Sequence, residues 1–130
     1  MKSDGDRTER PPGAPTSVED LEVFKLAHAL VLKVYEFTRT FPREETFGLV
    51  TQLRRAAGSV AANLVEGAGR LNRPEYRQFV GIAKGSAAEA SYHVLLARDL
   101  GYVSKERCDE LRDDYNRVAQ MLTRLGQALS

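Results

Sequence analysis

The chain has 130 residues, of which 42% are hydrophobic and 28% charged, a composition typical of one globular domain and unlike that of a disordered chain. Its 19 basic and 18 acidic side chains leave a net charge of +1, too small to indicate a nucleic-acid or membrane partner by charge alone. The single cysteine, Cys108, excludes an intramolecular disulfide and a cysteine-based metal cluster within one chain.

Residues 1–17 combine charged side chains with prolines and glycines and contain no apolar run. This composition predicts a flexible tail over 1–17 and a folded domain over 18–130. The same residues lack the apolar stretch of a signal peptide, and the chain nowhere reaches the run of about eighteen apolar residues that spans a membrane. We therefore expect a cytoplasmic protein with no membrane partner.

A first helix is expected from about Val18 to Thr40. Thr16 or Ser17 can cap its start, with an acidic residue three positions on to complete a capping box. Pro42 ends it, because proline disfavours helical geometry at the preceding residue. Apolar residues form two lines at helical spacing along this segment, which indicates two packing neighbours.

A second helix is expected from about Glu44 to Ala68, and Gly67 and Gly69 can adopt left-handed dihedrals at its end. One line of residues at steps of three and four forms a core face: Val50, Leu53, Ala57, Val60 and Leu64. A second line beside it is small and polar: Gln52, Ser59, Asn63, Glu66 and Arg70. Polar residues next to a core face predict an interface or a hydrogen-bonded layer that sets assembly.

The third helix begins after Asn72, whose spacing to Glu75 forms a second capping box, and runs from about Arg73 to Leu100. Ser104 opens a fourth helix whose apolar line keeps heptad spacing as far as Leu129. Four helices joined by short links must be antiparallel neighbours. The predicted fold is all-α, an antiparallel up-down-up-down four-helix bundle.

When positions of helices two and three are paired at equal distances from the link that joins them, Glu89 falls opposite Arg54 and Arg55. We therefore expect Glu89 to meet Arg54 or Arg55, either as an ordinary partly exposed ion pair or as part of a polar layer. The residues assigned to this interface or polar layer are Gln52, Ser59, Asn63, Glu66, Ser86, Glu89 and His93.

Catalytic patterns are weak in this chain. Glu89 and His93 share a helix face, but di-iron bundles need Glu-x-x-His motifs on two helices, and this pair has another spacing and occurs once. Ser59 and Ser86 lie within helices without a strained turn or an oxyanion-hole motif. The sequence predicts a non-enzyme without metal or cofactor, and a metal-dependent enzyme using Glu89 and His93 is the less favoured alternative.

Two surface features indicate partners instead. Helices two and three carry small residues on nearly every face. High helix propensity could explain the alanines but not Gly58, Gly81 and Gly85, so we expect packing against another subunit. Arginines near the link between these helices can hold phosphates. The nucleic-acid contacts to test first are Arg54, Arg55, Arg70, Arg73 and Arg77.

A run of motifs in order carries a family resemblance: FPREE at 41–45, QLRRAA at 52–57, NLVEGAGR at 63–70, EYRQF at 75–79, IAKGS at 82–86 and LGY at 100–102. Over about residues 18 to 127 the chain resembles the four helix bundle protein family. That family includes proteins encoded in bacterial 23S rRNA intervening sequences and the accessory variability determinant of diversity-generating retroelements.

The resemblance implies a cytoplasmic bacterial protein that assembles as a ring-like homopentamer without catalytic activity. For the retroelement accessory protein it further implies binding to a reverse transcriptase and to RNA or DNA through a basic surface. That accessory protein is strongly basic, whereas this chain is nearly neutral. The sequence thus leaves two functions open: a homo-oligomeric scaffold for a nucleic-acid-associated machine, and a protein-binding adaptor without nucleic-acid affinity.

Overall fold

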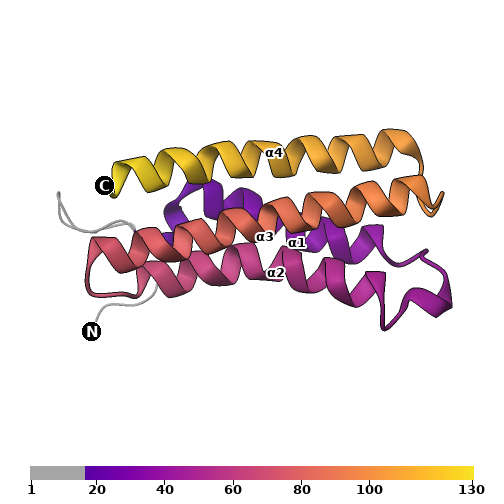
Figure 1. The fold of residues 1–130 in the computed structure, drawn as a ribbon, viewed down its shortest axis with the longest axis horizontal. Coiled ribbons are helices and arrows are strands. Elements are labelled where there is room, and N and C mark those ends of the chain that lie inside the picture. Colours follow the sequence, from indigo (N-terminus) through magenta and orange to yellow (C-terminus); the bar gives the residue numbers. More distant parts are fainter. Residues whose placement is uncertain (1–16) are drawn as a thin grey trace, which may run out of the picture.

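The computed structural model describes residues 17–130, so all of the predicted 1–17 tail except Ser17, including the candidate cap Thr16, lies outside the described residues. Four helices follow one another: α1 (Glu22–Phe37), α2 (Leu49–Ala68), α3 (Arg73–Asp99) and α4 (Lys105–Ala128). Figure 1 shows each helix running back along the one before it, with α1 behind the others. Across residues 17–130 there is no strand. The predicted all-α up-down-up-down bundle is confirmed.

The core lies along the bundle axis and contains the apolar lines predicted from the sequence. Its largest fully buried side chains come from all four helices: Leu30, Val34, Leu53, Val60, Leu64, Val94, Cys108, Tyr115, Val118 and Leu122. Buried alanines on α2 and α3 allow these two helices to pack closely along most of their length. The helix α1 contacts α2 and α4 but not α3, so α1 and α3 are diagonal in the bundle.

The first helix is shorter than predicted at both ends. Ser17 caps a separate 3-10 turn, η2 (Val18–Asp20), in a capping box with Asp20, and extended backbone at Leu21 delays α1 until Glu22. At the other end, the hydroxyl of the buried Thr38 donates to the backbone carbonyl of Val34 (2.9 Å) and competes with the helix ladder. The chain then turns before Pro42 is reached.

The second helix begins five residues later than predicted, at Leu49, after a 3-10 turn η3 (Arg43–Glu45). The Glu45 carboxylate accepts from the Leu49 backbone N–H (3.1 Å) and from the Tyr102 hydroxyl (2.7 Å). The Tyr102 hydrogen bond, and next the Leu49 one, lower the pKa of Glu45. This carboxylate therefore starts α2 and ties the α1–α2 link to the α3–α4 link.

The prediction of left-handed dihedrals at Gly67 and Gly69 was wrong. Among the described residues only Gly101, in the α3–α4 link, has a positive φ, at 77°. Gly67 serves close packing instead, because a Cβ there would lie 2.9 Å from Tyr76 Cδ1 and from Phe79 Cβ on α3. A side chain at Gly67 would push the two helices apart.

Candidate interaction surfaces

Small and polar residues join α2 to α3 along one edge of the bundle. The hydroxyls of Ser59 and Ser86 lie 2.9 Å apart, and Asn63 Nδ2 donates to the Ser59 backbone carbonyl (2.8 Å) and hydroxyl (2.9 Å). These three side chains are half-buried. The Ser59–Ser86 contact connects the two helices, and Asn63 binds Ser59 from the next turn of α2.

Glu89 is the centre of the remaining polar contacts on this edge. It pairs with Arg55, so the predicted contact forms with Arg55 and not with Arg54, and it also meets His93 Nε2 at 3.2 Å. Arg55 further donates to Gln52 Oε1 (3.1 Å). These groups are partly exposed, so each ion pair contributes about 0–1 kcal/mol. Glu66, nearer the α2–α3 turn, pairs with Arg70 (3.2 Å).

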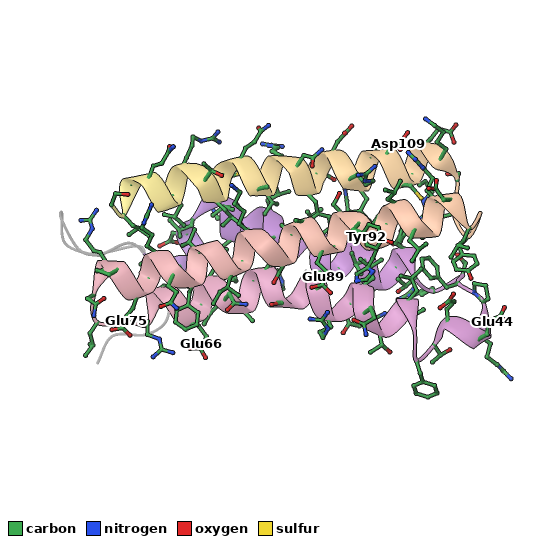
Figure 2. All side chains as sticks on the ribbon, in the orientation of Figure 1. Glu44, Glu66, Glu75, Glu89, Tyr92 and Asp109 are labelled. Carbon is green, nitrogen blue, oxygen red and sulfur yellow. The ribbon has the colours of Figure 1, made fainter. Side chains whose placement is uncertain are left out.

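We call this set the polar edge; its members are Gln52, Arg55, Ser59, Asn63, Glu66, Ser86, Glu89 and His93. Figure 2 shows Glu66 and Glu89 along the same side of the α2–α3 pair, with Glu75 at one end of the bundle and Glu44 at the other. Within residues 17–130, no three His, Cys, Asp or Glu side chains are grouped so as to hold a metal ion. The Glu89 carboxylate and His93 Nε2 are within hydrogen-bonding distance of each other.

Each of the five arginines predicted as nucleic-acid contacts already has a partner inside the chain. Arg54 Nε donates to Thr38 Oγ1 (2.9 Å), and its guanidinium lies 4.4 Å from the centroid of the Tyr35 ring. Arg54 thus holds the end of α1 against α2. Arg55 has the partners given above, and the Arg70 guanidinium lies 4.7 Å from the centroid of the Phe79 ring.

Arg73 and Arg77 share another role. Arg73 donates to the backbone carbonyl of Ala128, and Arg77 Nε donates to that of Gly126 (3.1 Å). Carbonyls in the last turn of a helix lack partners within the helix, and cations favour that end of its dipole. The two arginines therefore cap the C-terminus of α4.

The outward faces of α3 and α1 carry exposed apolar side chains. On α3 these are Ile82 and Tyr92, with 46% and 56% of their surface exposed, together with Leu100 at the C-cap of the helix, with 50% exposed. On α1 they are Leu32 and Tyr35, at 62% and 47%. Because α1 and α3 are diagonal, these two faces point to opposite sides of the molecule. The apolar lines predicted from the sequence include Tyr35, Ile82 and Leu100 but not Leu32 or Tyr92.

Sequence reasoning missed a groove between the first half of α3 and the last turns of α4. Its volume is about 680 Å³, and its lining includes Arg77, Val80, Gly81, Lys84, Leu122 and Gly126. The sequence signal was a pair of helix-interior glycines, Gly81 and Gly126, but only the packing of α3 on α4 shows that they face one groove. None of the described helices is both long and apolar enough to cross a membrane.

Comparisons with known proteins give a family and a fold. A family model described as 23S rRNA-intervening sequence protein matches residues 19–124. A crystal structure of a protein of unknown function from the S23 ribosomal protein family of Bacteroides thetaiotaomicron is similar to the chain, with a TM-score of 0.71 and 20% identity. The similarity covers 79% of this chain and 96% of that one. No curated protein matched the chain.

Proposed function

The chain belongs to the 23S rRNA-intervening sequence protein family, and we propose that it is a non-enzymatic, homo-oligomeric four-helix-bundle scaffold. The observation that carries this proposal is the pair of apolar faces on opposite sides of the bundle, Leu32 and Tyr35 on α1 and Ile82, Tyr92 and Leu100 on α3. Within residues 17–130 these side chains remain 46–62% exposed, although the Arg54 guanidinium lies over the Tyr35 ring. Two such faces on one chain are suited to contacts between copies.

Two different faces on opposite sides favour contacts of the head-to-tail kind, which close into a ring when the rotation between copies allows it. The family resemblance of the motifs supports five copies in that ring and a cytoplasmic location. Gly85 lies on the outward side of α3, and a Cβ there would have no atom within 4 Å. An open glycine on this face leaves room for the backbone of another copy.

Mass measurement in solution tests the assembly, and the chain offers leucines for matched variants. We expect a pentamer for the wild type at micromolar concentration, and smaller species for Leu32→Asp and for Leu100→Asp. Leu71→Asp is the control, because Leu71 is fully exposed in the α2–α3 turn, outside both faces. A monomeric wild type, or equal dissociation of all three variants, would contradict the proposal.

We further propose that the scaffold serves a nucleic-acid-associated machine, such as one built on a reverse transcriptase, with RNA or DNA held at the α2–α3 turn. Arg70, Arg73 and Arg77 lie near this turn, and their internal contacts use only part of the five N–H donors of each guanidinium. The remaining donors support phosphate binding.

Binding of structured RNA and of duplex DNA over a salt series tests this part. Arg70→Glu should weaken binding and reduce its salt dependence. Arg43→Glu is the matched control, because Arg43 lies in η3, at the end of the bundle opposite the α2–α3 turn. Absence of binding at low salt, or equal effects of the two variants, would show that the nucleic-acid part is wrong.

The alternative is an adaptor that binds proteins and ignores nucleic acid. Two observations favour it: the net charge of +1, and the internal partners of all five candidate arginines. A partner complex that survives nuclease treatment and high salt would support the adaptor over the nucleic-acid scaffold.

A further inference from the structure

We propose that the groove between α3 and α4 binds one amphipathic α-helix of a partner protein, with carboxylates on that helix facing Arg77 and Lys84. This goes beyond the proposed function, because the groove is separate from the exposed apolar faces of α1 and α3 and does not need a second copy.

The shape of the groove depends on two glycines. A Cβ at Gly81 would have no atom within 4 Å, and one at Gly126 would meet only Val80 Cγ1, at an ordinary 3.9 Å. Internal packing therefore does not require glycine at either position, although glycine inside a helix is less favourable than alanine. Open glycines on both walls allow the backbone of an incoming helix to approach closely.

The charge of the groove has one sign. Arg77 and Lys84 are its cationic side chains, and no Asp or Glu side chain lines it. Lys84 has no ion pair or hydrogen bond with residues 17–130, and Arg77 uses its Nε for the Gly126 carbonyl, which leaves its terminal N–H groups. The two cations are seven residues apart on one helix, a rise of about 10 Å. Carboxylates seven positions apart on a parallel or antiparallel helix would match them.

The second groove of the bundle is a useful contrast. It lies between α1 and α4, and its lining mixes cations with carboxylates: Lys33, Arg107, Glu36, Glu110 and Asp114. Lys33 and Asp114 already pair there at 3.3 Å. Its two cations face three carboxylates, so that groove has no excess positive charge for an acidic partner, whereas the α3–α4 groove has cations only.

The chemistry of the lining favours a helix over a nucleic-acid strand. Besides the cations, the lining contains the two glycines, the partly buried Leu129 and the amides of Gln78 and Gln127, and the buried core side chains Val80 and Leu122 form its floor. No lining residue is aromatic, so unpaired bases have no ring on which to stack. Aliphatic contacts flanked by charges are the usual requirement of helix-in-groove recognition.

The test is a selection from a displayed library of amphipathic helices whose polar positions are randomised among Glu, Lys and Gln. We expect enrichment of glutamates seven positions apart, and at least a tenfold loss of affinity of the selected peptide for Gly81→Leu and for Lys84→Glu. Gly58→Leu is the matched control, because a Cβ at Gly58 on α2 also has no atom within 4 Å. Melting curves confirm that each variant folds.

Three results would overturn the proposal. These are no saturable peptide binding up to millimolar concentration, enrichment of lysines over glutamates, and equal affinity of the peptide for Gly81→Leu and wild type. If the wild type binds a single-stranded RNA in place of the peptide, and Gly81→Leu abolishes that binding, the groove is a nucleic-acid site. Leu32→Asp should retain the peptide, which separates failure of this proposal from failure of self-assembly.

Discussion

The buried phenol of Tyr115 on α4 leads to a prediction in which the loss of a polar group stabilises the fold. The side chain is 1% exposed, and its hydroxyl has no hydrogen-bond partner among residues 17–130. Burial raises the pKa of this phenol, so it stays neutral at every pH at which the protein would be assayed. Tyr115→Phe removes the hydroxyl and leaves the ring, and we expect this change to stabilise the fold.

The magnitude follows from the cost of an unpaired buried polar group, about 1–3 kcal/mol. Removal of the hydroxyl leaves a small void, which offsets part of that gain. We expect a net increase of about 1 kcal/mol in the free energy of unfolding, or about 4 °C in the melting temperature of a chain of this size.

Urea and thermal unfolding, followed by circular dichroism at equal protein concentration, measure the effect. Equal concentration matters because self-association makes the melting temperature depend on it. Tyr102→Phe is the matched control, since it deletes the same atom where the hydroxyl donates to Glu45 Oε2 at 2.7 Å, and it should destabilise the fold. A lower melting temperature for Tyr115→Phe would refute the reasoning, because it would mean that the hydroxyl is paired in solution.

Three further stability predictions use the same assay. Gly67→Ala should destabilise the bundle, because the added methyl group would lie 2.9 Å from side-chain atoms of α3. Gly81→Ala should stabilise it by about 0.5–1 kcal/mol, because a Cβ there meets no atom and alanine favours the helix. Stability changes of the same sign for both variants would contradict this. Leu53→Ala should cost about 2–5 kcal/mol, because Leu53 is fully buried, and a cost below about 1 kcal/mol would mean that the core is not packed as described. The hydrogen bond from Tyr102 lowers the pKa of Glu45, so its stabilising effect is present above the unfolded-state pKa and is lost as the pH falls through the lower folded-state pKa. Glu45→Gln should therefore lose less stability than wild type between pH 6 and pH 3, and parallel losses would refute the assignment.

The family and its fold were accessible from the sequence because both depend on local patterns. Apolar residues at steps of three and four mark a helix face wherever they occur, and short links leave antiparallel neighbours as the outcome. Aligning helices by level also brought Glu89 to Arg55, since antiparallel helices joined by a short turn keep their register. Caps at Ser17, Asn72 and Ser104 formed where local sequence placed them.

Tertiary structure decided where α1 ends, where α2 begins and which partners the arginines contact. Thr38 ends α1 where its hydroxyl meets Arg54, and Glu45 starts α2 while bound to Tyr102, 57 residues away. Such contacts join residues that no periodic pattern relates.

By itself, then, the sequence determined the helices, their apolar faces and their antiparallel order, because each follows from the spacing of nearby residues. Tertiary structure alone decided that Arg73 and Arg77 cap α4 and that Gly81 faces Gly126 across an open groove. The physical reason is that a hydrogen bond or a groove depends on the position of atoms from two helices at once. The spacing within either helix does not contain that position.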